Sequence, residues 1–266
     1  HLNIAIAAVA LLVLPFFMQA IGLTIDSAID VIVLATAALA LNLLFGYTGL
    51  ISFGNGLWFG LGIYAAALAH LHWFPGQMLL PVIIAVAIVA AGSTILGFLI
   101  LRRTGVYFSL LTLALTALFY AIAFRWTEVT GGENGLGGIV RPSPFGIPTT
   151  TSASYYVLAA IVVFVLVFAI QRFVRSPIGT VLVAIRENEE RARFLGYATP
   201  AYKLICFVVS ATVTGLAGTL FLFHHRFASA DPLSPAFSGE LLAMVLIGGS
   251  RSFLGPALGA LFYVLF

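Results

Sequence analysis

Ionic side chains gather in one stretch of the chain, residues 172–203, between two long apolar segments. Glu187 with Arg191 and Glu189 with Arg193 stand four residues apart with the acidic member first, the more stabilising order on a helix. Such a surface can bind a partner protein by charge, or it can lie on lipid headgroups. Because three glutamates within four residues would be repelled by an anionic leaflet, the sequence favours protein docking.

Helix signals frame this ionic stretch. Ser176 and Pro177 are typical of a helix start, as N-cap and first helical residue, and Gly196 is a typical stop. We therefore predict one amphipathic helix over Ser176–Gly196, followed by another that begins at Thr199 and Pro200. The 4-3-4-3 spacing predicts a shared face made of Val181, Ile185, Asn188, Ala192 and Leu195.

A glycine-rich segment, Thr130–Gly138, is the second feature that could bind something. It has no preceding strand and does not complete G-x-G-x-x-G, so it does not indicate a phosphate-binding loop. It is either a flexible turn or a close-packed gate in which small residues let backbones approach. The candidate gate residues are Thr130, Gly131, Gly132 and Asn134.

Polar residues inside apolar segments are a third feature. Asn42 and Asn55 lie in successive segments, and Ser109, Thr112 and Thr116 share one face of a later one by their spacing of three and four. They either make hydrogen bonds between helices or line a polar pathway. We regard Asn42, Asn55, Thr112 and Thr116 as pathway candidates.

Familiar catalytic and metal-binding patterns are absent from the sequence. The only lysine follows Tyr202, so there is no Walker A motif, and neither G-x-S-x-G nor H-E-x-x-H occurs. His224 and His225 are adjacent and should point apart on a helix, and Cys206 is the single cysteine. We predict no enzyme activity, no bound metal and no cofactor on this chain, and its twelve basic residues do not indicate nucleic acid.

The amino-acid composition indicates the class of fold that holds these residues in place. Hydrophobic residues make up 62% of the 266 and charged residues 8%, against roughly 25% charged in an average soluble domain. So few charges cannot cover a soluble fold of this size. The sequence therefore predicts an all-α polytopic bundle in the membrane, as a single domain over 1–266.

Apolar runs of the length needed to cross a bilayer predict about eight spans. Glycines make the third irregular or re-entrant, and Gly-Gly and Gly-Pro pairs break the last into two helices. The chain begins at His1 rather than Met and stops in an apolar run, so we expect it to continue at both ends. The spans are Leu2–Ile21, Ala28–Phe45, Ile51–Leu71, Leu79–Leu101, Val106–Phe124, Tyr155–Ile170, Leu204–Phe223 and Glu240–Phe266.

Basic residues set the expected orientation. With this span count, the loop holding Arg102 and Arg103 lies on the same side as segment 172–203, and together they hold eight of the twelve basic residues. Loops rich in lysine and arginine stay in the cytoplasm. We therefore place 172–203 inside and the long loop 125–154 outside.

Six stretches, in order along nearly the whole chain, resemble one known family. The first, LNLLFGYTGLISFGNGLWFGLGIYAAAL, is similar to a signature of the LivM-type permease subunits of branched-chain amino acid ABC importers. The remaining five are Gly105–Leu115, Thr130–Leu136, Ser176–Tyr197, Tyr202–Leu220 and Leu246–Phe262.

The resemblance implies a subunit of the bacterial inner membrane that binds no nucleotide itself. Its partners would be a second, LivH-like permease, two ABC ATPase subunits that hold ATP and Mg²⁺, and a periplasmic binding protein. It also implies that the ionic helix rests on an ATPase. The coupling residues implied are Ser176, Pro177, Gly179, Arg186, Glu187, Asn188, Glu189, Arg191 and Gly196.

Substrate and mechanism stay open at this point. The resemblance implies branched-chain amino acids as the first substrate hypothesis, while urea, short amides and aromatic or other carboxylates are carried by similar permeases. Asn55 stands where many members of the family have histidine, so solute preference can differ. A stand-alone ion-coupled transporter is a second hypothesis, although it should have a buried acidic residue in mid-span. A structural membrane scaffold is the third.

Overall fold

The computed structural model describes residues 2–103, 105–141, 149 and 151–266, and its regular structure there is helical. The long helices are α1 (Leu2–Ala20), α2 (Ile25–Asn42), α4 (Leu79–Ile100), α5 (Val106–Arg125), α7 (Ser152–Val174) and α10 (Thr199–His225). The shorter ones are α3 (Asn55–Leu68), α6 (Thr127–Thr130), α8 (Pro177–Glu187), α9 (Glu189–Phe194), α11 (Pro235–Gly248) and α12 (Gly255–Leu265). Two π-helical turns, η1 (Leu43–Thr48) and η2 (Ala69–Trp73), extend α2 and α3.

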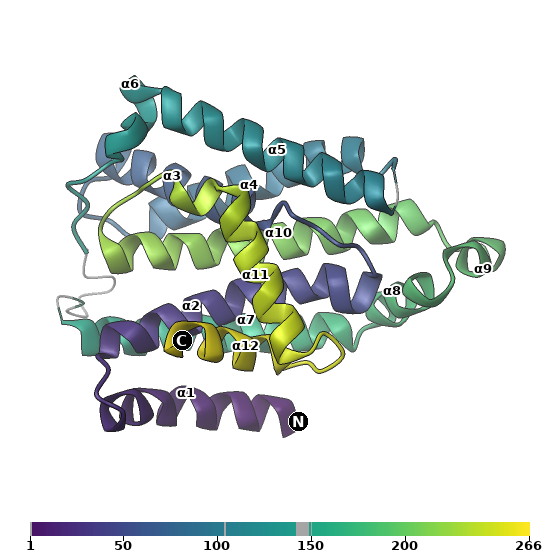
Figure 1. Cartoon of the computed structure of the whole chain (residues 1–266), viewed down its shortest axis with the longest axis horizontal. Helices are drawn as coiled ribbons and strands as arrows, with labels where there is room; N and C mark the ends of the chain where they lie inside the picture. Colours follow the sequence, from purple (N-terminus) through teal and green to yellow (C-terminus); the bar gives the residue numbers. More distant parts are fainter. Residues whose placement is uncertain (1, 104, 142–148, 150) are drawn as a thin grey trace.

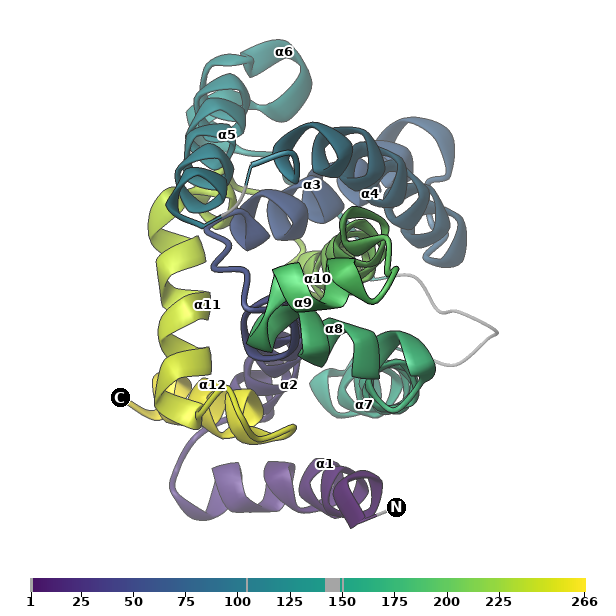
Figure 2. The same cartoon turned by 90° about the vertical axis from the view of Figure 1, so that its right-hand side faces the viewer.

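Two helices form the centre of the bundle, α2 and α10 (Figure 2). α10 packs against α2, α3 and α4, and α2 also packs against α7 and α12. α2 is buried along almost its whole length, whereas α1 lies at the edge with most of its side chains exposed. α11 crosses the other helices steeply on one face of the bundle (Figure 1). The predicted helical bundle is confirmed.

Six helices in the described part of the chain are long and apolar enough to cross a membrane. They correspond to the predicted first, second, fourth, fifth, sixth and seventh spans. The predicted last span is two helices, α11 and α12, as expected. The third is irregular, as predicted: residues 49–54 are not helical and α3 begins only at Asn55.

Glycines allow α3 and α10 to approach closely. A Cβ on Gly218 would lie well inside van der Waals contact with the Phe59 carbonyl oxygen, and one on Gly62 would collide with the backbone of Gly215. Helices in membranes associate mainly through such close packing of small residues. This contact fixes the half-length helix α3 against the central helix.

The predicted single helix Ser176–Gly196 is wrong in its middle. Asn188 adopts an extended conformation (φ −159°, ψ 100°) that ends α8, and its side chain caps α9 by accepting a 2.8 Å bond from the Arg191 N–H. Asparagine favours this role because its short side chain competes for backbone donors. Glu187 and Arg191 therefore flank a break and form no ion pair among the described residues, so their predicted pairing is wrong.

The loops gather at two ends of the bundle (Figure 1). One end, which we call the α8 end, carries α8, α9 and the α4–α5 turn. The opposite end, the α6 end, carries α6 and the loop after α10. Nine of the twelve basic residues therefore lie at the α8 end: Arg102, Arg103, Arg172, Arg175, Arg186, Arg191, Arg193, Lys203 and Arg251, the last in the α11–α12 turn that packs against η1.

Candidate functional site

The element formed by α8 and α9 has one apolar face turned into the protein. Val181, Ile185 and Ala192 are buried together against Tyr202 of α10. The predicted shared face is thus confirmed for these three residues. It is wrong for Leu195, which is 71% exposed, and for Asn188, which forms the break.

Glu189 fastens α9 to the start of α10. Its carboxylate lies 2.5 Å from the Lys203 ammonium and accepts a 3.2 Å hydrogen bond from the Thr199 hydroxyl. The predicted pair with Arg193 is confirmed at 3.6 Å. Lys203 is buried, and among the described residues this carboxylate is the counter-ion of its ammonium group. Glu189 therefore acts within the chain rather than on the exposed surface.

Replacing Glu189 with glutamine should release α9. Leaving Lys203 without its charged partner costs about 2 kcal/mol, so the segment should open more often. We expect trypsin to cleave after Arg191 or Arg193 roughly tenfold faster, as the open population rises. Glu190 forms no ion pair among the described residues, so Glu190→Gln is the control. Equal cleavage rates in the two variants would contradict this role of Glu189.

The remaining coupling candidates fall into two groups. Glu187, Asn188 and Arg191 are exposed and available to a partner. Pro177 occupies the first turn of α8, and Gly196 ends α9 at a positive φ of 91°, both as predicted. The side chain of Ser176 instead donates to the Phe173 carbonyl at 2.6 Å, and Gly179 packs on the backbone of Val174.

Arg186 connects α8 to the end of α2. Its guanidinium donates to the carbonyl oxygen of Gly46, inside η1, and its aliphatic stem lies over Gly49. A side chain on Gly49 would crowd Arg186, and the positive φ of 75° there also favours glycine. Arg186 thereby links α8 to the point where α2 gives way to residues 49–54.

The polar face of α5 holds residues 49–54. The Ser109 hydroxyl donates to the Ile51 carbonyl at 2.7 Å, and the Thr116 hydroxyl donates to the Phe53 carbonyl at 3.0 Å. Thr112 accepts from the Phe53 N–H at 3.1 Å. The predicted common face of these three hydroxyls is confirmed. These hydroxyls supply hydrogen bonds that the backbone of residues 49–54 would have made internally if it were helical.

Asn42 and Asn55 are buried at joints between elements. The Asn42 amide donates to the Ser252 carbonyl at 3.4 Å, in the turn between α11 and α12. Asn55, the first residue of α3, donates to the Thr214 hydroxyl of α10 at 3.1 Å. Both side chains are 1% exposed. Each therefore joins helices, and the role of the two in a pathway stays a prediction.

The glycine-rich segment at the α6 end is closely packed. The Thr130 hydroxyl donates to the Ala123 carbonyl at 2.5 Å, and Leu136 pairs with Ala228 in an isolated antiparallel bridge. Gly131 and Gly135 both have positive φ and no room for a side chain. Gly132 also lacks room for one, while Asn134 is exposed. Of the long loop 125–154, residues 142–148 and 150 lie outside the described residues.

The expectation that His224 and His225 point apart is wrong. They end α10, and Asp30 of α2 lies 3.0 Å from His225 Nε2 and 3.7 Å from His224 Nε2. Arg141 donates to His224 Nδ1 at 3.1 Å, so His224 carries its proton on Nε2 and does not offer that nitrogen to a metal. No pattern in the sequence pointed to Arg141 or Asp30, since both are distant from the two histidines in the chain.

Arg141 closes the end of α10. It donates to the Phe223 and His224 carbonyl oxygens at 2.9 and 2.6 Å, and its guanidinium stacks 4.7 Å from the Tyr155 ring centroid. These carbonyls are unpaired at a helix C-terminus, where a cation is favourable. Burial lowers the pKa of the guanidinium from its ordinary value, with Arg226 a second cause.

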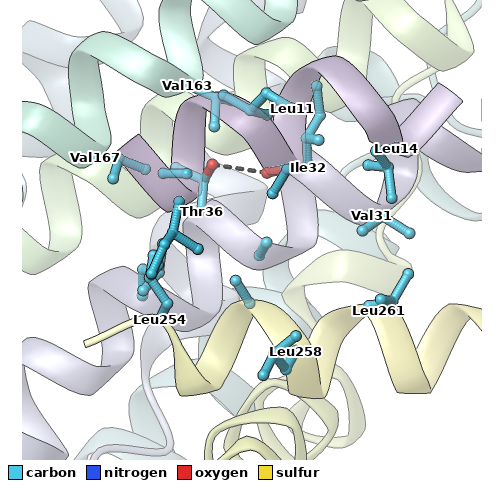
Figure 3. Close-up of a pocket in the computed structure, with 16 residues that line it drawn as sticks. Leu11, Leu14, Val31, Ile32, Thr36, Val163, Val167, Leu254, Leu258 and Leu261 are labelled. Carbon is cyan, nitrogen blue, oxygen red and sulfur yellow. Dashed lines mark hydrogen bonds between the residues drawn. The ribbon is translucent and has the colours of Figure 1, made fainter. Parts of the chain in front are cut away.

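An apolar cavity of about 190 Å³ lies between α1, α2, α7 and α12 (Figure 3). Leucine, valine, isoleucine and alanine form its wall. Its single hydroxyl, on Thr36, donates back to Ile32 of its own helix at 2.7 Å. None of the candidate residues borders it, and nothing in its wall could orient a polar solute.

Comparison with known proteins identifies the family to which this chain belongs. The family model described as "Branched-chain amino acid transport system / permease component" matches residues 23–266. The high-affinity branched-chain amino acid transport system permease protein LivM of Escherichia coli is 32% identical over 96% of this chain. The same protein of Salmonella typhimurium is 30% identical over 93%, and the probable LivM of Methanocaldococcus jannaschii is 27% identical over 86%.

These relatives are longer than the chain. It spans 66% of the Escherichia coli protein, 63% of the Salmonella protein and 75% of the Methanocaldococcus protein. No solved structure gives a significant match.

Proposed function

Because the chain belongs to the permease-component family of branched-chain amino acid transport systems, we propose that it is a transmembrane subunit of an ABC importer. The importer moves branched-chain amino acids inward across the bacterial inner membrane. A second, LivH-like permease completes the pathway, two ABC ATPases bind ATP and Mg²⁺, and a periplasmic protein delivers the solute. This chain performs no chemical step.

One observation of the structure supports this proposal in addition to family membership. The ionic element α8–α9 protrudes at the end of the bundle that holds nine of the twelve basic residues. Since positively charged loops remain in the cytoplasm, this end faces the ATPases. The exposed Glu187, Asn188 and Arg191 then form the surface that rests on an ATPase subunit.

The mechanism follows from how this surface is anchored. Closure of the ATPases on ATP pushes α8, and Arg186 transmits the push to η1. Residues 49–54, with α3 and α5, then change their exposure from one side of the membrane to the other, as alternating access requires. Segment Thr130–Asn134 is the outer gate in this scheme, because its close packing seals the α6 end. The solute shifts the balance only by binding the two states with different affinity.

Reconstitution tests this function directly. In liposomes holding this chain, the second permease and the ATPases, we expect leucine uptake that needs both ATP and the binding protein. The chain alone should take up none, with or without an ion gradient. Gradient-driven uptake by the chain alone would contradict the proposal and support an ion-coupled transporter. Uptake of urea, an amide or an aromatic carboxylate in place of leucine would reassign the substrate only.

A further inference from the structure

We infer that residues Gly49–Gly54, together with the Ser109 edge of α5, face the aqueous route of the solute across the membrane. The inference rests on the proposed function, and it assigns the solute route to one exposed face of this subunit. This face is the one that α11 crosses in Figure 1.

Segment Gly49–Gly54 is a non-helical part of a membrane crossing. α3 has 14 residues, which span about 21 Å as helix, whereas the apolar core of a bilayer is about 30 Å thick. The six residues before it run back from the end of η1 at the α8 end toward the middle of the bundle (Figure 1). The third crossing therefore uses an irregular segment through the half of the membrane nearer α8.

The hydrogen bonds of this segment are incomplete on its exposed side. Some of its backbone groups are paired: the Phe53 N–H and carbonyl bond to Thr112 and Thr116, and the Ile51 carbonyl accepts from Ser109. The Ile51 N–H and the Gly49 carbonyl make no hydrogen bond with any described residue. Gly49 is exposed, and Ile51 is 43% exposed.

Lipid is an unsuitable environment for such a segment. Each unpaired backbone group costs several kcal/mol in hydrocarbon, so irregular backbone at membrane depth is confined to protein interiors and water-filled cavities. The lipid-facing candidates elsewhere are unbroken helices with large exposed apolar side chains, such as Leu12 on α1, Ile95 on α4 and Ile161 on α7. Residues 49–54 also expose an apolar side chain, Ile51, but their backbone is not helical.

The chemistry of the exposed groups suits water and a polar solute. An unpaired N–H, an unpaired carbonyl and a solvent-reachable Ser109 hydroxyl supply donors and acceptors along the same face. An amino acid in transit exchanges hydrogen bonds with water for bonds of this kind. A largely apolar protein interface would instead leave these groups unsatisfied.

Cysteine labelling tests the inference in the assembled transporter. Cys206 is the only cysteine and is fully buried, so the unsubstituted chain is the blank. With a charged methanethiosulfonate that does not enter lipid, we expect Ile51→Cys to react at least tenfold faster than Ile95→Cys. Ile95 is 64% exposed and lies in the half of α4 nearer the α8 end. We therefore expect it at a depth in the membrane similar to that of Ile51, but facing lipid. Saturating solute with its binding protein should slow the Ile51→Cys reaction.

Two results would overturn the inference. One is that Ile51→Cys resists the charged reagent in every nucleotide and solute state. The other is that it reacts only with a lipid-soluble maleimide, as Ile95→Cys should. ATP-dependent uptake is measured on the unsubstituted assembly in parallel. If uptake is present while Ile51→Cys stays unreactive, the inference fails and the proposed function stands, whereas absent uptake counts against the function itself.

Discussion

Gly218→Ala should destabilise the protein more than the same change at Gly215, the other glycine of α10. The new Cβ would meet the carbonyl oxygen of Phe59, a backbone atom that cannot rotate away. Overpacking of this kind typically costs 1–3 kcal/mol or more, so α3 and α10 must separate at a cost of about 3 kcal/mol. For a chain of this length, that lowers Tm by roughly 6–12 °C. Thermal unfolding in detergent, followed by intrinsic fluorescence, measures the change.

The matched control is Gly239→Ala. Gly239 lies within α11, has no heavy atom within 4 Å of its would-be Cβ, and receives the same methyl group. Since alanine favours a helix over glycine by about 1 kcal/mol, this variant should be as stable as the parent or slightly more so. Equal Tm values for the two variants would show that α3 and α10 are not in the close contact described.

Arg186→Ala should uncouple ATP hydrolysis from transport in the reconstituted importer. The guanidinium is the polar link between α8 and the Gly46 carbonyl in η1. A hydrogen bond from a charged donor contributes about 1.5–3 kcal/mol. Coupling free energies between sites are of similar size, about 1–3 kcal/mol. We therefore expect the ratio of leucine moved to ATP hydrolysed to fall at least tenfold.

The control for this prediction is Arg172→Ala. Arg172 is an exposed arginine near the same end, in the last turn of α7, and makes no hydrogen bond or ion pair with a described residue. It removes the same charge without touching η1, so the transport ratio should stay near that of the parent. An unchanged ratio in Arg186→Ala, with the complex still assembled, would exclude transmission through Gly46.

Sequence reasoning succeeded where short-range physics decides structure. Apolar runs of membrane length, with few charges, fixed six of the helices to within a few residues, because hydrocarbon leaves the backbone no alternative to internal hydrogen bonds. Pro177 and Gly196 marked ends of the ionic element, because each suits only a few backbone conformations. Both signals lie within a few residues of what they determine.

The same reasoning failed where a distant residue supplies the partner. Asn188 fits a helical spacing pattern as well as a cap, and in the folded chain it is a cap beside the ion pair of Glu189 with Lys203. Adjacent histidines at a helix end meet one carboxylate because Asp30, 195 residues before His225, lies beside them.

The sequence by itself determined that this protein is a bundle of apolar helices with one ionic element, and it carried the motifs of the family. The sequence also predicted an irregular third segment, but the tertiary structure alone decided that residues 49–54 are its non-helical part and that Ser109, Thr112 and Thr116, about 60 residues away, hold them. The physical reason is that a helix satisfies its backbone locally. An irregular crossing needs donors and acceptors from elsewhere in the chain, and only the folded chain brings them there.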